Sequence, residues 1–183
     1  ASRIANPVGL RRVPGDTTGM VTLVNAAGAS YAHGAELFGV YNKEPVIVTA
    51  YYAATRTRET SAESGRLRES AYVPRTTAGI DAAFEEDDSG TRVGVEAFYT
   101  GPQSVEENPY RTIAPAYTTV GLLASQRLGL ATVYVNLENV TNVRQTSFDP
   151  LLRPTPGEGG RRTVDAWAPL EGRSFNAGVR WRL

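Results

Sequence analysis

The stretch that decides the fold is the C-terminal one, Phe175-Asn176-Ala177-Gly178-Val179-Arg180-Trp181-Arg182-Leu183. Its odd-numbered positions are all apolar, and its even-numbered positions are Asn, Gly and Arg. Successive side chains of an extended strand point to opposite faces. The alternation therefore predicts a β-strand with one apolar face and one polar face.

The same period of two recurs upstream in three segments, which are Ala78–Glu85, Val93–Tyr99 and Ala131–Glu138. Less regular strands are expected where β-branched and aromatic residues are enriched between Gly, Pro or Asn. These segments are Met20–Ala26, Glu36–Tyr41, Val46–Arg58 and Tyr117–Gln126. The sequence thus predicts an all-β fold, an antiparallel meander of about eight strands.

Composition excludes several functional classes. The 183 residues carry 19 basic and 19 acidic side chains, so the balanced charge argues against a nucleic-acid partner. There is no cysteine and a single histidine, His33, which removes disulfides, thiolate chemistry and any site that needs two imidazoles. No nucleotide-binding or hydrolase motif occurs, so we expect no cofactor, no metal and no enzymatic activity.

The connections between the expected strands alternate in length. Tight turns are expected at Asn42–Glu44, Asp87–Gly90 and Arg127–Leu128. The other connections, 59–74, 102–115 and 139–172, are long and carry Pro, Gly and charge. Long loops at one end and tight turns at the other are typical of bacterial outer-membrane barrels. The hairpin expected around Gly28 departs from this rule.

Alternating faces alone also suit a soluble β-sandwich, in which the apolar rows meet in a core. Aromatic residues near the ends of the expected strands favour a membrane barrel, in which they form belts at the two interfaces. They are Tyr99, Tyr117, Phe148, Trp167, Phe175 and Trp181. The pattern leaves open a soluble sandwich that acts as a binding module, a complete small eight-stranded outer-membrane barrel, and a segment of a larger barrel.

Three C-terminal motifs resemble the end of a TonB-dependent outer-membrane receptor. They are Asn136-Leu-Glu-Asn-Val-Thr-Asn142, Gln145-Thr-Ser-Phe-Asp-Pro-Leu151 and the run from Trp167 to Leu183. Upstream, Val24-Asn25-Ala26 followed by His33-Gly34-Ala35-Glu36-Leu37 resembles a strand, turn and strand of the same receptors, and Glu96-Ala-Phe-Tyr-Thr-Gly101 fits as well. The resemblance covers about residues 18 to 183.

This resemblance implies a receptor in the outer membrane of a Gram-negative bacterium that takes up a scarce nutrient with energy relayed by TonB. The nutrient classes are iron-siderophores, cobalamin and carbohydrates. Family barrels have 22 strands around a plug domain, so we expect residues 1–183 to be the C-terminal part of the barrel, without the plug. The implied partners are outer-membrane lipid, the plug and the TonB system, and the barrel assembly machinery, which binds the C-terminal strand. The family usually ends in an aromatic residue, whereas this chain ends in Leu183.

Two groups of polar residues are the candidate ligand contacts. The first group is expected to line the lumen, because alternation directs these residues away from the apolar rows: Glu36, Asp81, Glu96, Tyr134, Asn136, Glu138, Arg180 and Arg182. The second group lies in the last outer loop and would bind an anionic ligand through guanidinium groups: Arg144, Arg153, Arg161 and Arg162. For the lumen group, pairing with each other or with the plug is the favoured role. For the loop group, a solvated loop without ligand contacts is favoured.

A hydrolase built on the barrel wall is a further alternative. It would use His33 as the base and a nearby serine such as Ser30 as the nucleophile. We expect this alternative to fail unless the fold brings the two side chains within hydrogen-bonding distance.

Overall fold

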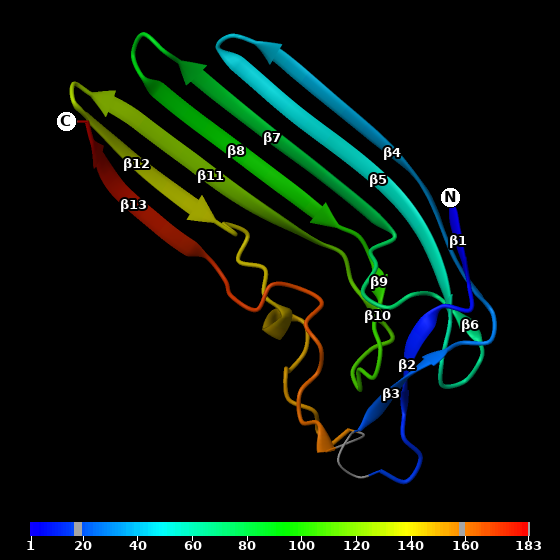
Figure 1. The fold of residues 1–183 in the computed structure, drawn as a ribbon. Coiled ribbons are helices and arrows are strands. Elements are labelled where there is room, and N and C mark those ends of the chain that lie inside the picture. The colour runs from blue at the N-terminus through cyan, green and yellow to red at the C-terminus, as the bar shows by residue number, and fades with distance from the viewer. Residues whose placement is uncertain (17–19, 158–159, 183) are drawn as a thin grey trace.

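The computed structural model of the chain describes residues 1–16, 20–157 and 160–182. It consists of strands and one short helix of the 3-10 type, and Figure 1 shows the strands side by side in one curved sheet. The main sheet has the order β1-β4-β5-β7-β8-β11-β12-β13, and β6 pairs with β5 off this path. The strands of this sheet are β1 (Ser2–Ala5), β4 (Ala29–Lys43), β5 (Val46–Thr60), β6 (Leu67–Arg68), β7 (Thr76–Glu86), β8 (Thr91–Thr100), β11 (Tyr117–Leu128), β12 (Ala131–Glu138) and β13 (Ser174–Trp181).

The remaining elements lie near the end of the sheet that carries the long loops (Figure 1). Strands β2 (Val8–Arg12) and β3 (Val21–Asn25) form a separate hairpin, and β9 (Gln103–Ser104) pairs with β10 (Ile113–Ala114). The helix η1 spans Gln145–Ser147. Among the described residues, no helix has the length and apolar character needed to cross a membrane.

Every pairing between the long strands is antiparallel, and over the middle of the sheet its register places apolar residues opposite apolar residues. Val133 lies opposite Val179, and Leu122 lies opposite both Val95 on β8 and Leu137 on β12. The predicted apolar rows therefore fuse into one apolar face that runs from β4 to β13. The predicted polar rows share the other face, which also carries Phe38 and Val40 of β4 and Leu123 of β11. The fold class predicted from alternation is confirmed.

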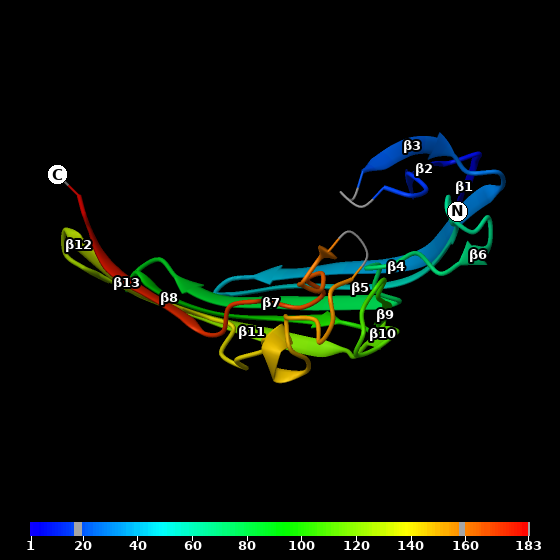
Figure 2. The same ribbon diagram turned by 90° about the horizontal axis from the view of Figure 1, so that it is seen from below.

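The sheet is a single layer, so the sandwich interpretation is wrong. The side chains of Val179 and Trp181 are 65% and 63% exposed instead of being sealed in a core. No second sheet of the described residues covers the apolar face (Figure 2). Leu183, the last residue of the predicted apolar row, lies outside the described residues.

The sheet is also open, so the interpretation as a complete eight-stranded barrel is wrong for the described residues. Its outermost strands, β1 and β13, pair only with β4 and β12 and not with each other. Strand β1 covers β4 only over residues 29–32, which leaves residues 33–43 of β4 as an edge. The observed architecture is part of a barrel wall.

The curvature identifies which face is the inner one. The β2–β3 hairpin lies over the concave side of the sheet (Figure 2). Ser30 and Glu59, which belong to the polar face, line the hollow beneath this hairpin. The polar face is therefore concave, and the apolar face is convex.

The predicted turns and loops fall at opposite ends of the sheet. Turns at 44–45, 87–90 and 129–130 join the strands at one end, and the loops after β5, β8 and β12 lie at the other. The last turn was predicted at Arg127–Leu128 but occurs at Gly129–Leu130. Gly129 has φ +62° there, a left-handed conformation that glycine adopts without strain. The turn at 87–90 was predicted correctly, and its Gly90 has φ +66°.

The N-terminal region differs from the prediction. The strand expected at Met20–Ala26 corresponds to β3, but it pairs with β2 and not with β4. The start of β4 pairs instead with β1, which the sequence did not predict, and the Asn6 amide donates to the carbonyl of Gly28. The hairpin expected around Gly28 is thus replaced by a β1–β4 pairing and a separate β2–β3 unit.

Candidate functional site

The concave face carries two carboxylates at the centre of the wall. Asp81 on β7 lies directly opposite Glu96 on β8, so both side chains point to the same face. In the described part of the chain neither forms an ion pair. Like charges in opposite positions destabilise a sheet. The centre of the concave wall is therefore an acidic spot that a cation would stabilise.

The two carboxylates border a hollow of about 460 Å³. Its other polar lining residues include Arg92, Tyr134, Asn136, Glu138 and Asn176. Five of the eight predicted lumen residues thus come together in one place, from the three strands β7, β8 and β12. Alternation predicts such a cluster because residues paired across neighbouring strands lie on the same face of the sheet. It does not predict which strands are neighbours.

Glu138 differs from the central pair because its carboxylate is already satisfied. Asn136 Nδ2 donates to Glu138 Oε1 at 3.0 Å, and Ser174 Oγ donates to Glu138 Oε2 at 3.1 Å. Nearer the turns, Arg92 Nε pairs with Glu85 Oε1 at 2.9 Å. Free negative charge on this part of the wall therefore concentrates at Asp81 and Glu96.

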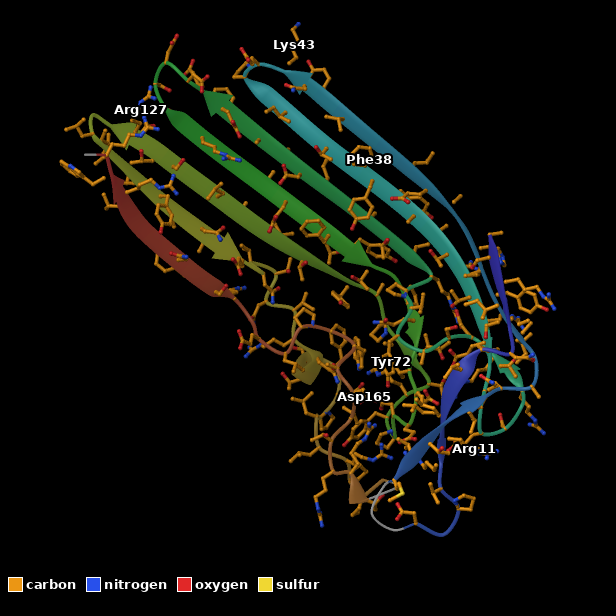
Figure 3. The ribbon with its side chains drawn as sticks, in the orientation of Figure 1. Arg11, Phe38, Lys43, Tyr72, Arg127 and Asp165 are labelled. Carbon is orange, nitrogen blue, oxygen red and sulfur yellow. The ribbon has the colours of Figure 1, made fainter. Side chains whose placement is uncertain are left out.

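The other three predicted lumen residues lie apart from this hollow. Glu36 faces the concave side from β4, opposite Ala53. Arg180 lies opposite Thr132 near the turns, and Arg182 follows the end of β13, where its backbone amide donates to Leu130. Figure 3 shows the two ends of the wall, with Lys43 and Arg127 at the turn end and Tyr72 and Asp165 at the loop end.

The long loops pack into a small folded unit of their own. Gln145 is fully buried, and its Oε1 accepts hydrogen bonds from the amides of Trp167 at 2.8 Å and Ala168 at 3.3 Å. Its Nε2 donates to the Asp165 carbonyl at 3.0 Å. Trp167 packs with Val105 and Ala114 in the core of this unit.

The sequence predicted Trp167 to lie in an aromatic belt, and this prediction is wrong. Trp167 is only 5% exposed and lies within the loop core. Phe148 packs against it at a tilt of 56° with ring centroids 5.2 Å apart, and the Arg111 guanidinium lies 5.3 Å from the centre of the Trp167 ring. Both aromatic residues stabilise the outer loops. Phe175 and Trp181, at the two ends of β13, remain on the convex face.

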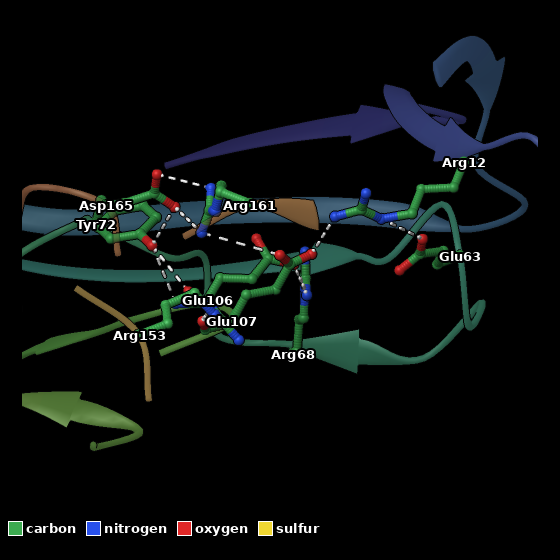
Figure 4. A network of polar contacts seen from close by, with 9 residues as sticks. All are labelled: Arg12, Glu63, Arg68, Tyr72, Glu106, Glu107, Arg153, Arg161 and Asp165. Carbon is green, nitrogen blue, oxygen red and sulfur yellow. Dashed lines mark hydrogen bonds and ion pairs between the residues drawn. The ribbon is translucent and has the colours of Figure 1, made fainter. Parts of the chain in front are cut away.

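A polar network ties the three loops and the β2–β3 hairpin together (Figure 4). Tyr72 Oη lies 2.9 Å from Asp165 Oδ2 and 3.0 Å from the Glu106 carbonyl oxygen. Arg161 Nη1 donates to Asp165 Oδ1 at 2.9 Å. Arg12 Nη2 of the hairpin pairs with Glu107 Oε1 at 2.7 Å. The charges of this network neutralise one another and fix the loops above the concave face.

The four predicted loop arginines divide into two pairs. Arg161 binds Asp165, and Arg153 Nη1 donates to the Glu107 carbonyl, so these two side chains hold the loops together. Arg144 and Arg162 are exposed, and in the described residues neither forms an ion pair. The structure thus leaves Arg144 and Arg162 accessible to solvent.

The loop groups with shifted pKa values include Tyr72 and Glu69. Burial raises the pKa of the Tyr72 hydroxyl to about 12, so this group stays protonated as a donor. The hydrogen bonds that Arg75 donates to Glu69, at 2.7 and 2.8 Å, lower the pKa of that carboxyl. Neither group was singled out by the sequence. The hydrogen bonds of Tyr72 join residues far apart in the chain, and no periodic pattern in the sequence indicates them.

The Ser30–His33 pair that a hydrolase would use is not formed, because the two side chains lie on opposite faces of β4. Ser30 faces the concave side and its Oγ accepts a hydrogen bond from the Thr60 amide at 3.3 Å, whereas His33 faces the convex side opposite Arg56. Within the described residues, no group of three or more His, Asp or Glu side chains is placed to hold a metal ion.

Comparison with known proteins agrees with this architecture. No protein-family model and no curated protein matches the chain. Among solved structures, it matches the ferric-catecholate import receptor Fiu from E. coli K12 with a TM-score of 0.63 and 15% identity, over 97% of this chain and 23% of that one. It matches the FrpB iron transporter from Neisseria meningitidis (F3-3 variant) with a TM-score of 0.63 and 15% identity, over 97% of this chain and 27% of that one.

The chain thus spans about a quarter of the length of these solved structures. At this level of identity the likeness concerns the fold. The fold is that of part of the barrel wall of a TonB-dependent receptor, and the resemblance expected from the sequence is confirmed at this level.

Proposed function

We propose that this chain, with the wall fold of TonB-dependent receptors, forms part of an outer-membrane receptor that imports a scarce nutrient with energy from TonB. Residues 1–183 are the C-terminal part of its barrel, and transport rather than catalysis is its activity. The observation that carries the proposal is the single-layer sheet with an apolar band across its convex face and a polar concave face that has two unpaired carboxylates at its centre.

The convex face has the character and length of a lipid-facing band. Between Val46 and Ala54, a stretch of nine residues, β5 presents only apolar or aromatic side chains on this face. A tilted transmembrane β-strand needs about 9–11 residues to cross the hydrocarbon core. The band contains on its other strands Leu37, Ile80, Phe84, Val93, Val95, Val120, Leu122, Val133, Val135, Leu137, Phe175 and Val179. Outer-membrane lipid is the partner that such a face fits.

The concave face then meets water and the plug domain. Asp81 and Glu96 are unpaired carboxylates on a wall whose other acids are largely satisfied. Guanidinium or ammonium groups of a plug would relieve their mutual repulsion. In this arrangement TonB acts through the plug, and the wall supplies the charges that hold the plug in place. Strand β13 serves as the recognition element for the barrel assembly machinery.

The nutrient that we propose is an iron chelate. The matched structures are described as a ferric-catecholate import receptor and an iron transporter. Ferric chelates of this class are anionic, and Arg144 and Arg162 are the accessible loop cations that could pair with them. Cobalamin and carbohydrates are the competing nutrient classes.

Uptake of a radiolabelled ferric catecholate tests the proposal. The gene that encodes this chain is deleted, and uptake is measured in strains with and without functional TonB. We expect uptake to depend on both the gene and TonB. Uptake that is unchanged in the deletion strain would refute iron-chelate transport, and recovery of the protein outside the outer-membrane fraction would refute the receptor assignment.

Matched charge variants test the role of the concave wall. Asp81→Asn combined with Glu96→Gln removes the two central carboxylates, whereas Asp87→Asn combined with Asp88→Asn removes the same charge from a turn. We expect the first pair to reduce uptake about tenfold at equal protein level and the second to leave it unchanged. Equal uptake by both variants would exclude a role of the central pair.

A further inference from the structure

A cluster of cationic side chains lies on the convex face at the loop end of β4 and β5. On this face His33 lies opposite Arg56, and Tyr31 lies opposite Arg58. Arg56, Arg58, His33 and Tyr31 are all exposed. This cluster is on the opposite side of the sheet from the acidic wall, so it takes no part in the proposed path of the nutrient.

The loop after β5 adds Arg75 and Glu69 to the cluster. Arg75 donates to both carboxylate oxygens of Glu69, at 2.8 and 2.7 Å. Arg56 Nη1 donates to the carbonyls of Thr55 at 3.1 Å and Arg75 at 3.5 Å, so its guanidinium is positioned by the backbone. In the described part of the chain no carboxylate forms an ion pair with Arg56 or Arg58. Three guanidiniums thus share one carboxylate, which leaves two positive charges in excess.

These residues surround a hollow of about 660 Å³. The hollow is lined by Tyr31, His33, Arg56, Thr57, Arg58, Glu69 and Arg75. Guanidinium groups present paired donors that match two oxygens of a phosphate. The lining is therefore suited to a tetrahedral dianion or monoanion held by Arg56 and Arg58.

The position of the hollow decides the source of the phosphate. Arg56 is two residues beyond Ala54 on the same face of β5, where the apolar band ends. A tyrosine at this level, Tyr31, is typical of a membrane interface. Lipid phosphates lie at the level where the hydrocarbon ends, and basic clusters at that level attract anionic headgroups.

We propose that this cluster binds the phosphate of a phosphorylated lipid headgroup in the leaflet on the loop side. The inference rests on the proposed function in that it requires the convex face to meet lipid. Arg56 and Arg58 bind the phosphate, and Tyr31 and His33 line the site beside it. Glu69 limits the positive charge of the site.

Binding is measured with the purified protein in a neutral detergent, by native mass spectrometry and by titration with lipid A that carries two phosphates. Dephosphorylated lipid A and inorganic phosphate are the comparison ligands. Arg56→Gln combined with Arg58→Gln removes the site. Arg11→Gln combined with Arg66→Gln is the matched control, since both residues are exposed and lie outside the lining.

We expect the Arg56 and Arg58 double variant to bind phosphorylated lipid A about 30-fold more weakly, and the control to bind like the unchanged protein. Glu69→Gln is expected to bind several-fold more tightly, because it removes the one carboxylate. Equal affinity of the two double variants, equal binding of dephosphorylated lipid, or equally tight binding of inorganic phosphate would each overturn the proposal. This titration does not involve TonB, so its outcome is separate from that of the uptake assay.

Discussion

Asp81 and Glu96 occupy directly opposite positions on β7 and β8, and their carboxylates share the concave face without a cation between them. Such a pair is unfavourable for the wall taken alone, by about 0.5 kcal/mol. It is consistent with a wall that is completed by a cationic partner.

Asp81→Asn should therefore stabilise the isolated chain and weaken the complete receptor. Relief of the repulsion should raise the free energy of unfolding in detergent by about 0.5 kcal/mol, measured by urea titration of tryptophan fluorescence. Glu138→Gln should change stability in the opposite direction, because Glu138 accepts two hydrogen bonds. If both variants shift the midpoint in the same direction, the repulsion between Asp81 and Glu96 does not govern the effect.

Val179→Arg should destabilise the protein in a bilayer. The Val179 side chain lies in the apolar band of β13, where an arginine in the middle of a bilayer costs about 2–4 kcal/mol. Folding into lipid vesicles at increasing urea concentration measures the loss. Asn176→Arg, on the opposite face of the same strand, should cost much less. Comparable losses for the two variants would contradict the assignment of the convex face to lipid.

Gln145→Ala should loosen the outer loops without unfolding the wall. The substitution leaves the amides of Trp167 and Ala168 and the carbonyl of Asp165 without their partner, at about 1–3 kcal/mol for each group that water cannot reach. Hydrogen exchange at the amides of Trp167 and Ala168 should accelerate, while exchange in β12 stays slow. Gln145→Glu keeps the acceptor oxygen and should have a smaller effect at these two amides.

Acidification should weaken the Glu69–Arg75 contact. Arg75 lowers the folded-state pKa of Glu69 below its ordinary value of 4.5. A carboxyl whose pKa is lowered by folding contributes stability above its unfolded pKa and loses it as pH falls through its folded pKa. The contribution is therefore present above pH 4.5 and declines below it.

Proteolysis of the loop between β5 and β7 as a function of pH measures this decline. The pair is partly exposed, so the effect should remain below about 1 kcal/mol. Glu69→Gln should remove that pH dependence. A variant that retains the full pH dependence would assign it to another group.

Alternation predicted most of the wall because the side-chain period is a local property. The strand at Ala131–Glu138 was predicted residue for residue, and β7 and β8 to within two residues at each end. The predicted strand began at Glu36, whereas β4 begins at Ala29. Its first residues were missed because Ala32, Gly34 and Ala35 do not alternate between apolar and polar. The four residues of β1 are too few for a pattern.

The loop unit escaped prediction for a different reason. Gln145 and Trp167 are joined across 22 positions, and Tyr72 and Asp165 across 93. These contacts depend on the sheet bringing three loops to one end. The sequence shows that the loops are long and polar, but their partners are fixed only by the fold. The cationic cluster at Arg56 and Arg58 likewise depends on register, which places it opposite His33 and Tyr31.

Strands β4 and β5 are 15 residues long, whereas β12 and β13 have eight. The difference of seven residues corresponds to about 23 Å of strand, and much of it lies at the loop end, so the rim of the wall slopes. On the tall side the loop end of the wall is bounded by a continuous hydrogen-bonded ladder, which resists bending. On the low side it is bounded by the loop between β12 and β13, held by side-chain contacts. Any outward bending of the loop end should therefore begin on the low side, while the tall side stays rigid.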